Sequence, residues 1–272
     1  MPVPQIFNRE LKKLHRDRSA SLLNSKNDFL IEEGAQRIAE TFDEEIIEKF
    51  PFVLDLGCRL GNLSQNLIGK AAIEKIVQCD ISEKYINAAI SPFSEMKIVA
   101  DEENLPFAPD SFNAVLSSLS LHWVNDLPGT LIQINRILKD RGLLIASFLG
   151  GSTLNEFRES ILQIEIEKYG GTSPSVSPFL EIKDAGALLQ RTGYKFPISH
   201  SDIITVNYDN IYSITKDLRA MGETNSLLKM RKTLRTKTTL DLINKKYKEL
   251  YSTENGEIKA TFEIVTIVGW KN

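Results

Sequence analysis

Short apolar runs alternate with segments of helical spacing between residues 27 and 150. The apolar runs predict strands at residues 52–56, 73–79, 97–100, 114–118 and 143–148, and the helical spacing predicts helices at 27–50, 62–68, 83–90 and 127–138. The strands are apolar on both faces, as in parallel sheets, whose crossover connections cover both faces with helices. This part of the chain therefore predicts an α/β, Rossmann-like domain.

After residue 150 the alternation gives way to longer helical segments. Helical spacing returns at 153–169, 182–191 and most of 209–251, a strand is predicted near 202–206, and Thr alternates with Ile or Val in a closing strand at 258–270. We expect these two late strands to complete a mostly parallel sheet of seven strands, with helices on both faces and a helical insertion late in the chain.

These patterns divide the chain into four parts. Residues 1–26 are a basic N-terminal segment for which no regular structure is predicted, and 27–150 are the core of the sheet. Residues 151–257 are a helical insertion or lid with a returning strand, and 258–272 are a strand that rejoins the sheet. Ligands of open α/β sheets bind at the carboxyl ends of the strands, which predicts a site there.

Composition narrows the class of protein. The chain is 42% hydrophobic and 25% charged, as soluble globular proteins are, and no apolar run approaches the ~20 residues of a membrane span. A net charge of -3 provides no electrostatic footprint for nucleic acid. Cys58 and Cys79 lie near predicted strand ends, which favours a reducing compartment and predicts neither a disulfide scaffold nor a metal site. We expect a cytoplasmic protein that is not integral to a membrane.

The most informative segment is the turn after the first predicted strand. Residues 53–61 (VLDLGCRLG) lead Asp55, Gly57 and Gly61 into the start of a helix. Glycine permits positive φ and lets backbone amides approach a ligand closely. Dinucleotides and S-adenosylmethionine (SAM) both use such turns, but a carboxylate here suits the ammonium of a methionine tail and repels a pyrophosphate. The absence of G-x-G-x-x-G spacing also favours SAM.

Acidic residues also stand at the ends of the next two predicted strands. Asp80, followed by Ile81, comes near the ~20-residue offset from the turn at which an acid accepts ribose hydroxyls. Asp101 and Glu102 follow the third strand, where they can accept from an adenine amino group. Each acid alone is as typical of a helix cap or a turn, but acids at three successive strand ends together predict a nucleoside site.

With these motifs the chain resembles the type 11 SAM-dependent methyltransferases, whose first motif matches residues 54–61. The resemblance narrows to the complex I assembly factors of mitochondria that carry a methyltransferase fold, and to their bacterial relatives. The segments that continue this match are residues 6–12, 100–107, 117–128, 170–179, 221–225 and 269–271. The methyltransferase of early biotin synthesis, which esterifies a malonyl thioester on a carrier protein, is similar more distantly.

The resemblance implies a class I methyltransferase fold, SAM as cofactor, and action on a subunit of NADH:ubiquinone oxidoreductase, reported for the family as arginine hydroxylation. The candidate cofactor-binding residues are Asp55, Gly57, Cys58, Arg59, Gly61, Asp80, Ile81, Asp101, Glu102 and Ser118. Arg59 departs from the family, which has glycine there. Its guanidinium could bind the methionine carboxylate or close the site, and we expect it to point outward and leave binding intact.

Beyond the cofactor, His122 and Trp123 follow the fourth predicted strand, where a transferred methyl group would face a substrate. Histidine suits a general base near neutral pH and tryptophan suits a pocket wall, although the pair could instead pack the start of a helix. The loop at 170–178, rich in Gly and Pro, suits either a lid or a disordered excursion. Residues 216–248 hold ten basic and three acidic side chains, which fits an acidic protein partner or a solvated helical face.

Three hypotheses follow for the function. The first is an enzyme that binds SAM and modifies a protein partner, a subunit of a respiratory NADH dehydrogenase, through which it would associate with the inner membrane. The second is an O-methyltransferase acting on a small-molecule or carrier-protein-bound carboxylate. The third is an assembly chaperone with a degenerate SAM site. RNA is not expected as a partner, because Tyr247 is the only aromatic residue of the basic segment.

Overall fold

A computed structural model describes residues 4–24, 27–45, 49–70, 73–93, 96–179, 181–231 and 235–272. The chain forms a seven-stranded sheet in the order β3-β2-β1-β4-β5-β7-β6. Its strands are β1 (Phe52–Leu56), β2 (Lys75–Asp80), β3 (Met96–Val99), β4 (Phe112–Ser117), β5 (Leu138–Leu149), β6 (Lys195–Tyr208) and β7 (Ile258–Trp270). The first five are parallel, and β7 runs antiparallel between β5 and β6. The predicted mostly parallel, seven-stranded α/β fold is confirmed.

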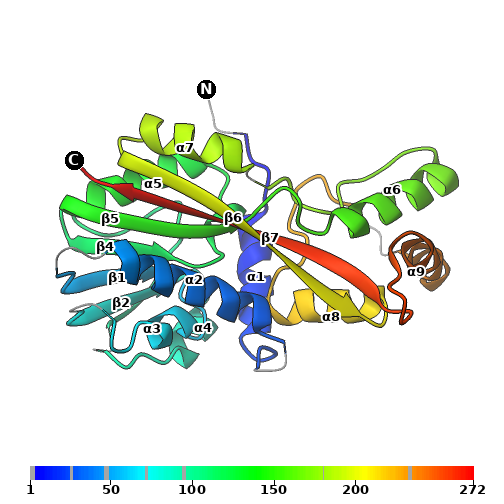
Figure 1. Ribbon diagram of the computed structural model, residues 1–272, viewed down its shortest axis with the longest axis horizontal. Helices are drawn as coiled ribbons and strands as arrows, with labels where there is room; N and C mark the ends of the chain where they lie inside the picture. Colours follow the sequence, from blue (N-terminus) through cyan, green and yellow to red (C-terminus); the bar gives the residue numbers. More distant parts are fainter. Residues whose placement is uncertain are drawn as a thin grey trace.

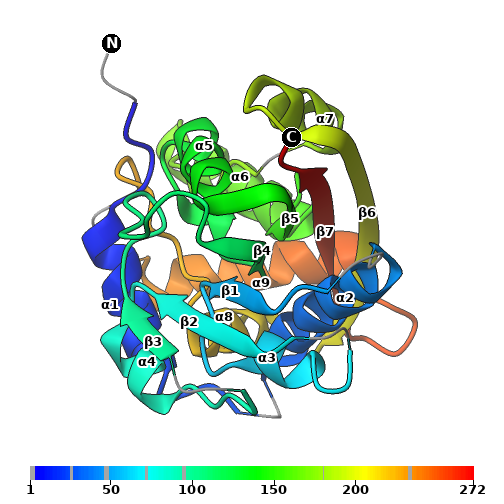
Figure 2. The same cartoon turned by 90° about the vertical axis from the view of Figure 1, so that its left-hand side faces the viewer.

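Helices cover both faces of this sheet (Figures 1 and 2). They are α1 (Arg9–Ser19), α2 (Phe29–Glu45), α3 (Asn62–Asn66), α4 (Glu83–Ala88), α5 (Leu127–Ile137), α6 (Asn155–Tyr169), α7 (Ile182–Arg191), α8 (Ile211–Ala220) and α9 (Lys237–Tyr251). Leu54 packs with Leu131 of α5 and Leu188 of α7, whereas its neighbour Val53 packs with Ile38 of α2 on the other face. Successive side chains of a strand point to opposite faces, so each strand must be apolar throughout.

A third apolar cluster lies beyond the end of the parallel strands. Strands β6 and β7 extend past the others, and α6, α8 and α9 gather around their far ends (Figure 1). Phe262 and Ile258 of β7 pack there with Ile161 of α6, Ile214 of α8 and Tyr247 of α9. Among the described residues, no helix combines the length and the apolar character that crossing a bilayer requires.

The N-terminal segment corrects the expectation of an irregular start, because it contains the helix α1. Asn8 caps this helix by accepting a hydrogen bond from the Leu11 amide at 3.0 Å. The buried residues of α1 are polar, among them Lys12 and Arg16, whereas Leu14 is 62% exposed. A search for apolar periodicity cannot find such a helix. Figure 2 shows α1 beside α4, close to the strand ends where a ligand is predicted.

Candidate cofactor site

The predicted glycine turn joins β1 to α3 and is held against the neighbouring strand. The amides of Gly57 and Cys58 both donate to the Cys79 carbonyl, at 2.7 and 3.0 Å. Gly57 has φ +79°, and a Cβ added there would lie 2.2 Å from Ser120 Oγ, so this position requires glycine. The Cys58 side chain packs with Ile86 and Ala89 of the α4 region, so any contact from this residue to a ligand would come from its backbone.

Asp55, at the end of β1, is fully buried beneath this turn. Its Oδ2 accepts a hydrogen bond from Ser64 Oγ at 2.9 Å, and Oδ1 has no hydrogen-bond partner. Burial, reinforced by the nearby Asp80, raises the pKa of Asp55 to about 7. Near neutral pH both the neutral and the charged form of this carboxyl group are therefore populated. A cation placed beside it would favour the charged form.

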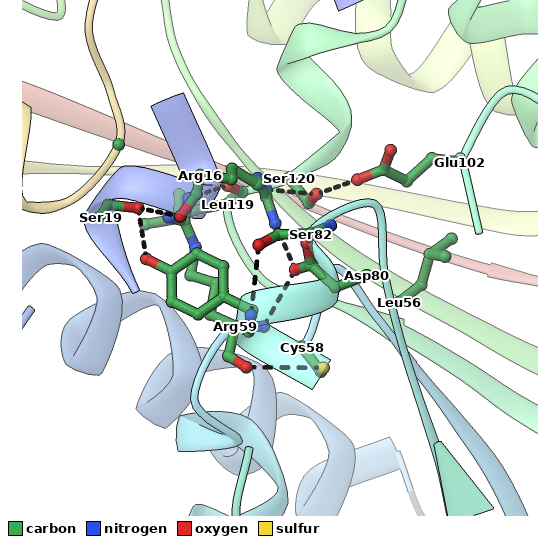
Figure 3. A network of polar contacts seen from close by, with 12 residues as sticks. Arg16, Ser19, Leu56, Cys58, Arg59, Asp80, Ser82, Glu102, Leu119 and Ser120 are labelled. Carbon is green, nitrogen blue, oxygen red and sulfur yellow. Dashed lines mark hydrogen bonds and ion pairs between the residues drawn. The ribbon is translucent and has the colours of Figure 1, made fainter. Parts of the chain in front are cut away.

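Asp80 ends β2 and is buried beside the turn, with Ile81 nearly buried after it (Figure 3). Its Oδ1 accepts from the Ser82 amide at 2.9 Å, and its Oδ2 accepts from the Arg59 amide at 3.1 Å. The same Oδ2 lies 2.5 Å from Nη1 of Arg16, which comes from α1. Asp80 thus lies at the end of its strand beside the glycine turn, and it pairs with a cation that the sequence pattern did not indicate.

Asp101 and Glu102, after β3, are likewise engaged by α1. Arg9 Nη2 lies 2.6 Å from Asp101 Oδ1 and also binds Glu102. Glu102 is buried and accepts a hydrogen bond from Ser120 Oγ at 2.7 Å. Burial opposes its ionisation, but Arg9 and Arg16 outweigh burial and lower the pKa of Glu102 to about 2. The acids predicted at successive strand ends therefore lie at one edge of the sheet. There Arg16 pairs with Asp80 and Arg9 pairs with Asp101 and Glu102, whereas Asp55 bonds Ser64.

Arg59 points into the protein, which corrects the expectation that it points outward. It has φ +52° and is 1% exposed. Its Nη1 donates to the Met221 carbonyl at 2.7 Å, and its Nη2 donates to the Leu119 carbonyl at 2.9 Å and to Glu223 Oε1 at 2.7 Å. The physical reason is the buried carboxylate of Glu223, which the fold brings from far along the chain to face the guanidinium.

Glu223 joins three parts of the site. Besides Arg59, its Oε1 accepts from Lys12 Nζ of α1 at 3.2 Å, and its Oε2 lies 2.6 Å from Trp123 Nε1 and 3.0 Å from His122 Nε2. Burial opposes ionisation of Glu223, but Lys12, His122 and Arg59 outweigh burial and hold its pKa well below the usual range. Glu223 lies within the 221–225 segment of the family resemblance, which gave no indication of this role.

The predicted catalytic pair forms a short 3-10 helix, Leu121–Trp123, after β4. His122 is buried, and desolvation lowers its pKa even though Glu223 acts in the opposite direction. With Nε2–H donating to Glu223, Nδ1 of the neutral ring carries a lone pair, and this atom has no hydrogen-bond partner. The geometry thus gives His122 a free basic nitrogen in a buried position.

A cavity of ≈ 220 Å³ lies next to this pair, and both Trp123 and Glu223 line it. Most of the remaining wall is apolar and comes from β5, α6, α8 and α9, with Val176 and Phe179 from the loop after α6. Asn225 Nδ2 donates to the carbonyls of Pro174 and Ser175, which holds the loop beside the cavity. The loop therefore forms part of the cavity wall, and its role as a lid stays a prediction.

Some buried polar atoms of the site have no hydrogen-bond partner within the described part of the protein. Four candidate site residues carry buried polar atoms without a partner: Asp55 Oδ1, Ser118 Oγ, Arg59 Nε and His122 Nδ1. Buried polar atoms are normally paired, so these unpartnered atoms of the site residues are available to a ligand. Within the described ranges, no group of three or more His, Cys, Asp or Glu side chains is arranged to hold a metal ion.

Comparison with known proteins agrees with this geometry. Residues 54–146 match the family model described as a methyltransferase domain. The YcgJ protein from Bacillus subtilis has the same fold, with a TM-score of 0.60 at 14% identity over 88% of this chain and 98% of that one. The fold and the glycine turn with its acids therefore define an enzyme of the SAM-dependent methyltransferase class.

The particular family follows from the whole sequence. "Arginine-hydroxylase NDUFAF5, mitochondrial" from Danio rerio is 38% identical over 98% of this chain and 83% of its own length. The chain belongs to this arginine-hydroxylase NDUFAF5 family. A malonyl-[acyl-carrier protein] O-methyltransferase from Methylovorus is 28% identical over 80% of this chain and 75% of its own length. Both resemblances found in the sequence are confirmed.

Proposed function

We propose that this protein binds SAM at the carboxyl ends of β1 to β4 and hydroxylates an arginine of a protein partner, a subunit of a respiratory NADH dehydrogenase. The observation that carries the cofactor site is the convergence of Asp55, Asp80 and Asp101 around the Gly57 turn. Family membership supports the arginine as target. The same proposal places a bacterial form in the cytoplasm, at the inner membrane through its partner.

Each acid has a separate task in this proposal. Asp80 would accept the ribose hydroxyls, Asp101 and Glu102 would face the adenine amino group, and Asp55 would offer Oδ1 to the ammonium of the methionine tail. Gly57 would let the backbone approach this tail. SAM supplies an electrophilic methyl group when bound. Hydroxylation instead replaces a C–H bond of the arginine by C–OH and leaves that methyl group in place, so it requires O2 and a two-electron reductant as co-substrates, with the second oxygen atom leaving as water.

Two measurements on the full chain test the proposal. Calorimetric titration with SAM should show a complex, and Asp80→Asn should weaken it strongly because the variant loses a charged acceptor. Asp110→Asn, an exposed carboxylate distant from the turn in the chain, is the control. The absence of binding by the unmodified protein would contradict the proposal. Mass spectrometry of the partner should then show the mass of one added oxygen rather than one added methylene.

His122 is proposed as the general base, whose unpartnered Nδ1 takes up a substrate proton during the reaction and returns it when the product leaves. We expect His122→Ala to slow modification of the partner by about 100-fold or more, since positioned general bases contribute rate factors of that order. SAM affinity and the melting temperature should change little by comparison. A folded His122→Ala protein with unchanged turnover would show that the residue only packs the short helix before α5.

The two other hypotheses each have one supporting observation. The apolar cavity beside Trp123 would suit the acyl chain of an O-methyltransferase substrate, and transfer of label from methyl-labelled SAM would support that function. The pairing of Asp80 and Asp101 with arginines of the chain itself would suit a chaperone that does not need the cofactor. Partner binding that is independent of SAM, without modification of the partner, would support the chaperone.

A further inference from the structure

Helix α1 docks on the site through charge rather than through apolar surface. Arg9, Lys12 and Arg16 are spaced by three and four residues, which places them on one face of the helix. All three side chains reach acids of the site: Arg9 reaches Asp101 and Glu102, Lys12 reaches Glu223, and Arg16 reaches Asp80. The inner face of α1 is therefore matched to the anions at the strand ends.

Arg16 lies nearest to the glycine turn. Its guanidinium is 1% exposed and divides its hydrogen bonds between Asp80 Oδ2 at 2.5 Å and Ser120 Oγ at 2.7 Å. Its Nη1 is also 3.7 Å from the position that a Cβ on Gly57 would occupy. Figure 3 shows Arg16 reaching in toward Asp80 and Ser120. Arg16 thus occupies the space directly above the turn, where the tail of the cofactor is expected.

The ion pairs of the site balance in charge before any ligand arrives, and Asp55, which bonds Ser64, stands outside these pairs. Four cations, Arg9, Lys12, Arg16 and Arg59, face four acids, Asp80, Asp101, Glu102 and Glu223. If ribose hydroxyls replaced Arg16 on Asp80, the Arg16 guanidinium would remain buried without a carboxylate in direct contact, since Glu102 reaches it only through Ser120, and this loss is unfavourable. A ligand that uses Asp80 must therefore bring an anion for Arg16. The amino-acid tail of SAM carries one in its carboxylate.

We propose that Arg16 is the binding partner of the methionine carboxylate of the cofactor and exchanges Asp80 for this carboxylate when the cofactor binds. Arg59, the residue that the sequence suggested for this contact, already donates to two backbone carbonyls and to Glu223. Arg16 has a single carboxylate partner and one hydroxyl, and a guanidinium suits a carboxylate bidentately. This inference rests on the proposed SAM site and assigns Arg16 as a positioning residue within it.

Two ligands separate this role from simple obstruction of the site. S-adenosylhomocysteine carries the amino-acid tail, whereas 5′-methylthioadenosine has the same nucleoside and lacks the tail. We would titrate both into the unmodified full chain and into Arg16→Gln, Arg16→Lys and Lys13→Gln. Lys13 is the matched control, because it is a half-exposed cation of the same helix paired with Asp17. The quantity compared is the ratio of the two dissociation constants in each protein.

We expect Arg16→Gln to raise the dissociation constant for S-adenosylhomocysteine by at least about tenfold, the typical effect of losing a hydrogen bond to a charged group. Binding of 5′-methylthioadenosine should be unchanged or tighter, since Asp80 is released. Arg16→Lys should give an intermediate ratio and keeps the test available if the glutamine variant folds poorly. Lys13→Gln should leave the ratio unchanged.

Other outcomes overturn the inference. If Arg16→Gln bound S-adenosylhomocysteine as tightly as the unmodified chain or more tightly, Arg16 would only obstruct the site, and the proposed function would stand without this contact. An equal loss for both ligands would also contradict a role specific to the tail. If the unmodified chain bound neither ligand, the proposed cofactor site itself would fail together with the inference.

Discussion

Replacing Glu223 with glutamine is expected to lower the free energy of unfolding by about 3–5 kcal/mol, the usual effect of removing one partner from a buried ion pair. Glutamine keeps the size of the side chain but leaves Lys12 and Arg59 buried without their counter-ion. It also offers the Trp123 and His122 donors a single neutral acceptor oxygen. Urea unfolding of the two proteins, followed by circular dichroism, measures this difference.

Glu254→Gln is the matched control for this substitution, because Glu254 is exposed and its replacement should change stability by less than about 0.5 kcal/mol. Equal stability of the Glu223→Gln variant and the unmodified chain would contradict a central electrostatic role for Glu223. Loss of Lys12 pairing should also loosen α1, so we expect a protease to cleave the variant more rapidly within residues 9–24.

The second large effect concerns pH and Asp55. In the unfolded chain Asp55 loses its proton near pH 3.8, whereas in the folded protein it retains it up to about pH 7. Between these values the folded state binds more protons, so the contribution of Asp55 to stability falls as pH rises. A pKa change from 3.8 to about 7 corresponds to about 4 kcal/mol across this window.

Asp55→Asn removes this titration, and comparing the two proteins cancels the contribution of His15, which is the same in both. Burial lowers the pKa of His15 to about 4, so stability from His15 rises with pH between about 4 and 6.5, in the opposite direction. We therefore expect the stability difference between the unmodified chain and Asp55→Asn to shift by about 4 kcal/mol in favour of the variant from pH 4 to pH 7. Denaturant unfolding at several pH values measures this shift; a constant difference would mean that Asp55 titrates normally.

Much of the core could be predicted because its pattern is local. The strand, turn and helix around Asp55 and Gly57 lie within one short segment, and parallel strands necessarily bring Asp80 and Asp101 to the same edge. The predicted strand near residue 202 is longer in the structure, Lys195–Tyr208. It is an edge strand with many exposed positions, so only its most apolar part resembles a strand in the sequence.

The electrostatic half of the site could not be predicted in the same way. Arg9, Lys12 and Arg16 look like solvated cations of a basic segment, and nothing local shows that they meet acids of the core. Glu223 lies some hundred residues from its partners His122 and Trp123 in the chain. The available signal was the spacing of these cations by three and four residues, which places them on one face of a helix. This spacing can be interpreted as part of the site only once the buried acids opposite it are known.

The position of β7 has a consequence for synthesis on the ribosome. Strands β1 to β5 can pair as soon as they emerge, but β6 finds no neighbour until residues 258–270 have been translated, because β7 separates it from β5. Until then the edge of β5 in the nascent chain is unpaired, although its residues are buried in the complete fold. Such an edge can pair with strands of other chains and promote aggregation. Translation of the final strand covers that edge and completes the apolar cluster that α6, α8 and α9 form around its far end.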